Sequence, residues 1–434
     1  MRNALLRSFA SQAIGLGICL FVICVMVLPV AAQTPTTATI EGTVLDANGA
    51  ALPGVSVEVK NSDTNFTRTF STDEDGRFVA LTLPPGKYTI TVAKTGFATT
   101  VVRDVELTVG RALALPIKMG VSGVQEQVTV TATPTVDTTK IESSTTLDEK
   151  AVSTTPILGR KFEDLLTLTP GVSIVQGPDG DEINFAGQRG IFNNVSLDGG
   201  DYNNGFFGEQ AGGQRAAIDI TLEAVKEFQV VATGANAEFG RTAGGVINVI
   251  TKSGTNEFHG SLFHYQRLEA LTANDANGEP LTDFRREQFG GTIGGPIKRD
   301  KAFFFFASEN IREKLTRANL SSQVGTTACP VSAPTIVVNE GLINSNFDCQ
   351  RLALINFFQT SRNQAEGDPI EHTIRNNALL GKVDVDFTSN HRLTLSHNFD
   401  YSKNENQTFD VPTYGNSANG TEGASKINVF NANL

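Results

Sequence analysis

The stretch from Glu238 to Gly254 reads EFGRTAGGVINVITKSG and decides how the rest of the chain is interpreted. A glycine pair, Gly244 and Gly245, gives way to an apolar run that Asn248 interrupts once. Glycine permits backbone conformations, and close approaches to other backbones, that a Cβ atom would forbid. The physical pattern alone therefore predicts a tight turn that feeds a short, buried β-strand.

Further motifs extend this pattern over residues 139–254. The segment LGRKFEDLLTLTPGV (158–172) has apolar residues at helical spacing as far as Leu168, and its Pro-Gly pair predicts the end of the helix. The segment NVSLDG (194–199) predicts a strand that enters an Asp-Gly turn, and AVKEFQV (224–230) precedes the glycine pair. These motifs predict one α/β domain.

In this order, the motifs resemble the plug domain of TonB-dependent outer-membrane receptors; a free-standing α/β domain is the alternative. The resemblance implies that the upstream part of the chain fills a pore that the downstream part builds. It assigns seven residues to plug architecture and not to ligand contact: Arg189, Gly190, Asp198, Gly199, Gly244, Gly245 and Asn248.

The segment before the plug, residues 123–138, is a polar linker with one alternating strand. That strand consists of Glu126, Gln127, Val128, Thr129, Val130, Thr131 and Ala132. A lone strand with an acidic start and a proline stop can add to the sheet edge of another protein through backbone hydrogen bonds. It resembles the TonB box, which implies a TonB-type periplasmic energy transducer as partner; a simple linker strand is the alternative.

Residues 33–122 predict a small β-sandwich, because about seven short alternating segments are separated by turn signals. The segments GTVLD (42–46), TDEDGRF (72–78) and LPPGKY (83–88) resemble the carboxypeptidase regulatory-like domain. That family has a transthyretin-like or immunoglobulin-like fold related to carbohydrate-binding modules. The resemblance implies binding or spacing and not peptidase chemistry.

Residues 255–434 predict the first part of a transmembrane antiparallel β-barrel. Between 379 and 387 apolar residues share one strand face, while Lys382, Asp384 and Asp386 share the other, and 393–401 repeats the alternation after a short turn. Each run is about ten residues long, which suits a tilted transmembrane strand. A soluble sandwich is the alternative, and the two aspartates are interpreted as lumen-facing and not as a catalytic carboxylate pair.

A second hairpin, QFGGTIGGPI (288–297) followed by KRDK (298–301) and FFFF (303–306), has a basic turn that suits a periplasmic end. Together with TKSGTNEFHGS (251–261), it resembles the Oar-like subgroup of TonB-dependent receptors, which carry the same N-terminal sandwich. Plugged transporters use about 22 strands, whereas these residues hold about seven to nine. An open sheet edge cannot lie in lipid, so the sequence is expected to be a truncated, front part of such a receptor.

The first 32 residues predict a secretory signal peptide. Arg2 and Arg7 precede an uncharged apolar run, 13–28, and small residues then favour cleavage between Ala32 and Gln33. A membrane-spanning helix is the alternative, because the apolar run is about long enough for one. In the oxidising compartment that export implies, Cys329 and Cys349 can form a disulfide, and two unpaired thiols are the alternative.

Composition and motifs also exclude some functions. The chain has 35 Lys and Arg against 46 Asp and Glu and a net charge of -11, which argues against a nucleic-acid partner. The 41 glycines and the absence of tryptophan favour strands and turns, so the fold is predicted to be mainly β. The five histidines form no HExxH pattern, and the sequence has no Gly-x-Ser-x-Gly elbow and no P-loop. Neither an enzyme nor a cofactor nor a metal is expected.

The resemblance implies an outer-membrane receptor that imports a ligand with energy from the inner-membrane TonB complex. Its expected partners are the transducer, outer-membrane lipid and a small ligand such as a siderophore, oligosaccharide, peptide or vitamin. The alternative is a cell-surface binding or adhesion protein that uses its sandwich and loops, for example on carbohydrate, without transport.

Overall fold

The computed structural model describes residues 36–121, 142–157, 159–177, 180–203, 220–236, 239–240, 242–274, 278, 281–317, 360–363, 370–407 and 420–433. The predicted cleavage site, the segment 126–132 and both Cys329 and Cys349 lie outside these residues. Within the described ranges, no helix is long and apolar enough to cross a membrane.

The N-terminal part is a β-sandwich, as predicted. Its strands are β1 (Ala38–Asp46), β2 (Ser56–Asn61), β3 (Thr67–Ser71), β4 (Arg77–Leu83), β5 (Gly86–Ala93), β6 (Thr100–Leu107) and β7 (Ala112–Met119). One sheet has the order β4-β1-β7 and the other β3-β2-β5-β6. Alternate residues of these strands are buried in one hydrophobic core, which contains Tyr88, Ile90 and Val92. Strand β4 was not predicted individually, although turn signals flank it.

The second part contains a mixed five-stranded sheet with the order β12-β11-β14-β13-β8. Its strands are β8 (Ser143–Leu147), β11 (Asn194–Leu197), β12 (Gly200–Asp201), β13 (Val225–Thr233) and β14 (Val246–Thr251). The helices α2 (Glu149–Thr154) and α3 (Phe162–Leu166), the hairpin β9 (Val172–Gly177) and β10 (Gly180–Phe185), and the short 3-10 helices η1 (Gly190–Phe192) and η3 (Leu222–Ala224) complete it.

Strand β14 is the centre of this sheet and is the strand that the opening stretch predicts. It pairs in parallel with β11 and antiparallel with β13, and all six of its residues are buried. Asn248 interrupts the apolar run but not the strand, because the Ser196 hydroxyl donates to Asn248 Oδ1 at 2.8 Å. A buried amide that is hydrogen-bonded in this way is compatible with the sheet interior.

Helix α3 is shorter than the sequence predicts. It ends at Leu166, whereas the prediction placed its end at the Pro170-Gly171 pair and counted Leu168 on its apolar face. Leu168 is 49% exposed, because the chain leaves the helix for a turn in which the Leu168 N–H donates to the Leu165 carbonyl. The buried face of α3 consists of Phe162, Leu165 and Leu166.

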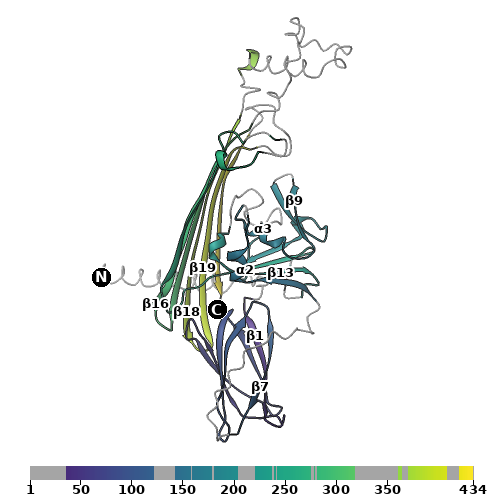
Figure 1. Cartoon of the computed structure of the whole chain (residues 1–434), viewed down its shortest axis with the longest axis vertical. Helices are drawn as coiled ribbons and strands as arrows, with labels where there is room; N and C mark the ends of the chain where they lie inside the picture. The colour runs from purple at the N-terminus through teal and green to yellow at the C-terminus, as the bar shows by residue number, and fades with distance from the viewer. Residues whose placement is uncertain are drawn as a thin grey trace, which may run out of the picture. The chain divides into compact units, whose positions relative to one another are not determined.

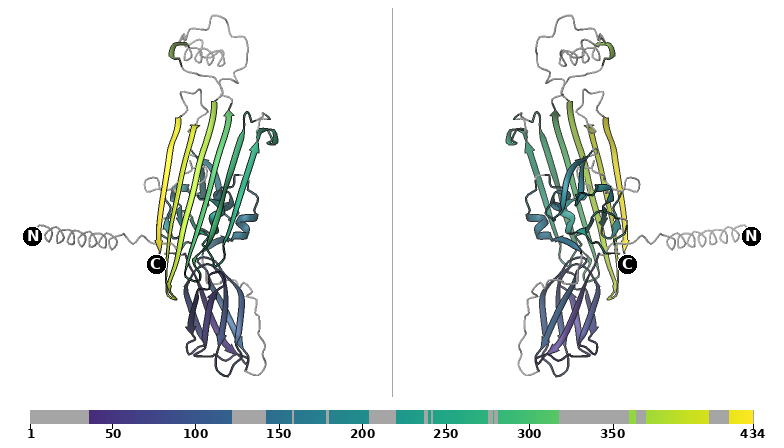
Figure 2. Two further views of the ribbon diagram at one scale, coloured as in Figure 1. Left: turned by 90° about the vertical axis from the view of Figure 1, so that its left-hand side faces the viewer. Right: turned by 90° about the vertical axis from the view of Figure 1, so that its right-hand side faces the viewer.

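The third part is a six-stranded antiparallel sheet whose strands neighbour each other in chain order, and we call it the wall (Figure 2). Its strands are β15 (His259–Leu268), β16 (Arg285–Lys298), β17 (Ala302–Arg317), β18 (Ile370–Thr388), β19 (His391–Gln407) and β20 (Gly420–Asn433), with the 3-10 helix η4 (Glu269–Leu271) after β15. Strands β18 and β19 contain 19 and 17 residues and are therefore longer than the predicted ten.

The two faces of the wall have opposite chemistry, and the predicted alternation is confirmed. Lys382, Asp384 and Asp386 are buried on the inner face, which packs against the plug (Figure 1). An apolar cluster made of Ala224 in the plug and Phe305, Ala307 and Leu380 in the wall seals part of that contact. The outer face exposes large apolar side chains: Leu262, Ile293, Ile297, Phe306, Phe387, Leu395 and Phe430. An exposed apolar band over long alternating strands is typical of a lipid-facing barrel surface.

Candidate site that holds the plug against the wall

The Asp198-Gly199 turn lies between β11 and β12 and is attached to β14. Both residues have positive φ angles, 48° and 80°, which are typical of the tight hairpin turns that Asp-Gly favours. The Asp198 carboxylate accepts hydrogen bonds from the Thr251 N–H at 2.9 Å and from the Thr251 hydroxyl at 2.6 Å. The predicted turn residue therefore also fastens the end of the central strand.

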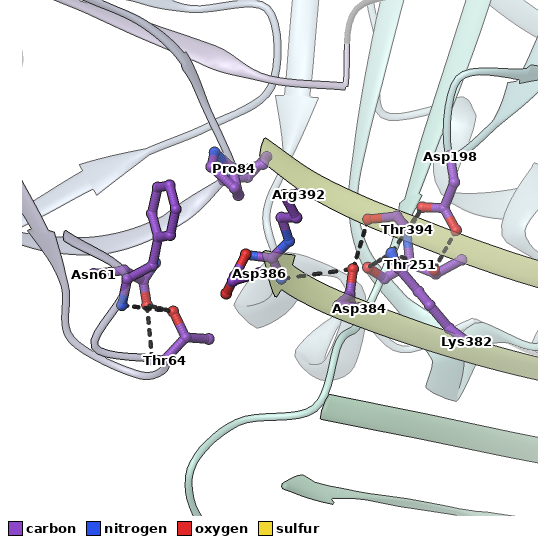
Figure 3. A network of polar contacts seen from close by, with 12 residues as sticks. Asn61, Thr64, Pro84, Asp198, Thr251, Lys382, Asp384, Asp386, Arg392 and Thr394 are labelled. Carbon is purple, nitrogen blue, oxygen red and sulfur yellow. Dashed lines mark hydrogen bonds and ion pairs between the residues drawn. The ribbon is translucent and has the colours of Figure 1, made fainter. Parts of the chain in front are cut away.

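Lys382, on β18 of the wall, reaches this same turn (Figure 3). Its Nζ lies 3.2 Å from Asp198 Oδ1, and it also donates to the Thr251 carbonyl oxygen at 3.3 Å. The side chains of Lys382 and Asp198 are only 6% and 4% exposed. A buried ion pair of this kind is costly to break, because the remaining charge is left without a partner away from water. We call Asp198, Thr251 and Lys382 the lock.

Strand β20 holds the same turn, and strand β19 holds the chain just after β12. On β20, Asn431 Nδ2 donates to the Leu197 carbonyl oxygen and Asn433 Nδ2 donates to that of Asp198, each at 2.7 Å. On β19, Asn398 Nδ2 donates to the Tyr202 hydroxyl at 3.1 Å. Away from this turn, Thr221 of the plug donates to the buried Glu309 carboxylate of β17 at 2.6 Å. These contacts to plug carbonyls and side chains come from β17, β18, β19 and β20 of the wall.

A second group of charged side chains, Asp384, Asp386 and Arg392, lies beside the lock on the wall (Figure 3). Asp384 Oδ1 accepts a hydrogen bond from the Thr394 hydroxyl at 2.7 Å, and the Arg392 guanidinium lies 3.5 Å from the same oxygen. Arg392 also lies 3.6 Å from Asp386 Oδ1. The two aspartates are therefore paired with a wall arginine on the inner face.

The glycine pair allows close packing, as predicted. The atoms that come close to it belong to side chains as well as to the backbone. A Cβ on Gly244 would lie 2.5 Å from Asn193 Oδ1 and 3.2 Å from the Phe192 carbonyl oxygen. A Cβ on Gly245 would overlap the Phe185 ring, a side chain that is 1% exposed. Neither glycine has a positive φ angle, so space and not backbone conformation requires glycine here.

Two other predicted plug residues, Gly190 and Arg189, do not belong to the lock. Gly190 begins η1, where a Cβ would lie 3.3 Å from the Ile183 carbonyl oxygen, and Arg189 before it is exposed. Sequence reasoning missed that Lys382 and Thr251 complete the lock around Asp198. The one available signal was that Lys382 is the only lysine or arginine on the strand face that it shares with Asp384 and Asp386.

A separate polar contact joins the sandwich to the plug, and it was not predicted. The Val109 N–H donates to Glu227 Oε1 of β13 at 2.9 Å, and Lys226 Nζ donates to the Pro85 carbonyl oxygen at 2.6 Å. Glu227 is 3% exposed, and this burial raises the pKa of its carboxyl from the ordinary 4.5 to about 7. Lys226 and the Val109 hydrogen bond oppose that shift, while the charges of Glu106 and Asp148 add to it.

We expect the docking of the sandwich on the plug to weaken as pH rises from 4.5 to 7. In this window the docked state keeps the Glu227 proton that the separated state loses, so the stabilisation is complete below pH 4.5 and is lost above pH 7. The free energy of docking should differ between these two pH limits by at most about 3 kcal/mol. Hydrogen exchange of the Val109 amide, corrected for its intrinsic pH dependence, measures it. Glu227→Gln keeps the acceptor and should remove the pH dependence; an unchanged slope in this variant would contradict the assignment.

Three family models match the chain in succession. The Carboxypeptidase regulatory-like domain matches residues 39–120, the TonB-dependent Receptor Plug Domain matches 137–246, and the Outer membrane beta barrel domain matches 250–434. Together with a plug packed on a wall that has an apolar outer face, these matches define a plugged β-barrel receptor of the outer membrane.

The comparison with curated proteins narrows this class. The chain is 30% identical over 302 residues to the TonB-dependent transporter Oar of Myxococcus xanthus, which covers 65% of this chain and 27% of that protein. In its domain order and its sequence the chain is similar to the Oar-like TonB-dependent receptors. It spans about a quarter of the length of this relative.

Solved structures with partial similarity include two bacterial outer-membrane proteins. The siderophore receptor PirA of Acinetobacter baumannii is 18% identical, with a TM-score of 0.38 and coverage of 63% of this chain and 33% of that chain. The outer membrane transporter YddB of Escherichia coli is 13% identical, with a TM-score of 0.41 and coverage of 62% and 34%. In the part of this chain that the structure describes, no group of three or more His, Cys, Asp or Glu residues could hold a metal ion.

Proposed function

We propose that this chain works as a receptor that imports a small ligand across the outer membrane when a TonB-type periplasmic transducer pulls on residues 126–132. In this proposal residues 33–122 are the sandwich, 139–254 the plug and 255–434 part of the barrel. The observation that carries it is the lock. Its Asp198–Lys382 ion pair is buried between the plug and the wall, and an applied force would have to break it.

The strand order of the plug supports a route for that force. Strand β8, which follows the linker in the sequence, is an edge strand of the sheet and, among the described strands, pairs only with β13. Strand β13 pairs with β14, and β14 ends at Thr251, which is hydrogen-bonded to Asp198. A pull on the linker would therefore load β8 first and the lock last. The arrangement favours displacement of the plug by force over a plug that is permanently closed.

The ligand class belongs to the same proposal. TonB-dependent receptors use the TonB complex and bind siderophore-type ligands, and a siderophore, oligosaccharide or peptide remains the expected cargo. The apolar outer face of the wall supports outer-membrane lipid as the surrounding partner. The relative from Myxococcus xanthus is a transporter and not an enzyme, and the absence of enzymatic activity in this chain stays a prediction.

Deletion of residues 126–132 in the complete receptor tests the proposal. Ligand binding to cells should survive, because the plug and wall are untouched, while energy-dependent uptake should fall to background. Deletion of residues 133–138 shortens the same linker by six residues, leaves the plug intact and is the matched control, which should retain uptake. If cells with the 126–132 deletion accumulate ligand as the control does, the chain is a surface binding or adhesion protein and not a transporter.

A further inference from the structure

A cleft of about 400 Å³ lies between the plug and the first two wall strands. Residues 152–157 of the plug, at the end of α2 and after it, form one side, and Tyr265 of β15 and Gln288 of β16 belong to the other. Three arginines line it, Arg160 from the plug and Arg267 and Arg286 from the wall, and no carboxylate does. A volume of this size is within the range of small-molecule sites, about 300–1,000 Å³.

Two of these arginines are already neutralised. Arg160 forms an ion pair with Glu223 at 2.8 Å, and its guanidinium lies 4.4 Å from the centre of the Tyr265 ring. Arg286 forms an ion pair with Glu313 at 2.8 Å and donates to the Gly159 carbonyl oxygen at 3.1 Å. Both guanidinium groups are therefore held in place by the protein and contribute little net charge to the cleft.

Arg267 differs from both. Its guanidinium lies 5.1 Å from the centre of the Phe284 ring, and within the described ranges it makes no ion pair. The residue is half-buried, so it has lost part of its hydration without a counter-ion in return. A guanidinium presents a planar fork of donors that matches a carboxylate in two parallel hydrogen bonds. The cleft is thus lined by one arginine that has no acidic partner within the described ranges, and the donors of its guanidinium suit a carboxylate.

The position of Arg267 places the cleft toward the outer end of the wall. Arg267 is next to the last residue of β15, and Arg286 is the second residue of β16. The chain between these strands, residues 269–284, is long, whereas β16 and β17 are joined at their other end by residues 299–301 only. Short turns lie on the periplasmic side of outer-membrane barrels and long connections on the outside. A ligand that arrives from outside meets the Arg267 end first.

We propose that this cleft binds a small monocarboxylate whose carboxylate pairs with Arg267 and whose apolar part lies against Tyr265. A single unmatched guanidinium balances one negative charge, which favours a carboxylate over a doubly charged phosphate ester. The inference deepens the proposed function by giving a chemical class to a ligand or ligand group in the import path. Binding itself does not depend on transport.

Calorimetric titration of the complete detergent-purified receptor with benzoate tests this assignment, with benzyl alcohol and phenyl phosphate as comparison probes. Benzoate should bind, benzyl alcohol should not, and phenyl phosphate should bind more weakly than benzoate. Arg267→Gln should weaken benzoate binding about tenfold, the usual effect of losing one charge-assisted pair, while Arg267→Lys should retain part of it. Arg299→Gln, an exposed arginine in the β16–β17 turn, is the matched control and should bind as the unmodified receptor does.

Several outcomes would overturn the assignment: no benzoate binding by the unmodified receptor, equal binding of the neutral alcohol, or full binding by Arg267→Gln in a receptor that still runs as a folded, heat-modifiable barrel. The result is independent of the linker deletions, which are scored by uptake. Uptake lost on deletion of 126–132 together with absent benzoate binding would reject only the cleft. Benzoate binding with uptake intact after the deletion would reject only the TonB-driven mechanism.

Discussion

Replacing Lys382 with methionine should weaken the seating of the plug by about 3–5 kcal/mol, because the Asp198 carboxylate then stays buried without its cation. Lys382 also donates to Thr251, so the same change removes a hydrogen bond from the end of β14. In cells that carry the complete receptor, a looser plug should admit a large glycopeptide antibiotic that the closed barrel excludes. Antibiotic sensitivity and protease cleavage of the plug are the two measurements.

Lys314, on the adjacent strand β17, offers a matched control for this prediction. It forms an ion pair with Glu371 at 2.8 Å, but the two side chains are 47% and 50% exposed. Exposed pairs contribute about 1 kcal/mol or less, so Lys314→Met should leave the plug seated. The double variant Asp198→Asn with Lys382→Met removes both buried charges and should recover part of the loss. Equal behaviour of Lys382→Met and Lys314→Met would contradict the role of the lock.

Replacing Gly245 with valine should destabilise the plug by about 3 kcal/mol or more, since the added atoms must occupy space that the Phe185 ring already fills. Phe185 is almost fully buried and cannot turn into solvent. Protease resistance of the plug in the complete receptor, followed through a denaturant series, measures the loss.

A compensating change separates crowding from other effects of the Gly245 substitution. Combining Gly245→Ala with Phe185→Leu gives the added methyl group room and should restore much of the stability that Gly245→Ala alone loses. Gly381→Ala is the control, because a Cβ at Gly381 meets no atom within 4 Å and should change little. If the Phe185→Leu background makes no difference, the clash with the ring is not the cause.

Several elements could be predicted because their causes are local in sequence. The Asp198-Gly199 turn follows from two residue types that tolerate positive φ angles, at the end of a short strand. The alternation through β18 and β19 predicts two opposite faces, because side chains point to alternate sides of a strand. The end of α3 was not predicted correctly, since Leu168 has a helical spacing that the chain does not use after Leu166.

The sequence by itself determined the sandwich, the plug motifs and the polar and apolar faces of the wall, since periodicity and turn chemistry act over a few residues. Only the tertiary structure decided which charges meet. Asp198 and Lys382 are 184 positions apart, and Val109 and Glu227 are 118 apart. A sequence pattern shows that a lysine faces the lumen, but whether it pairs with a given carboxylate depends on how the plug packs against that strand. The same limit applies to Arg267, because only the tertiary structure shows that Arg160 and Arg286 have acidic partners while Arg267 has none within the described ranges.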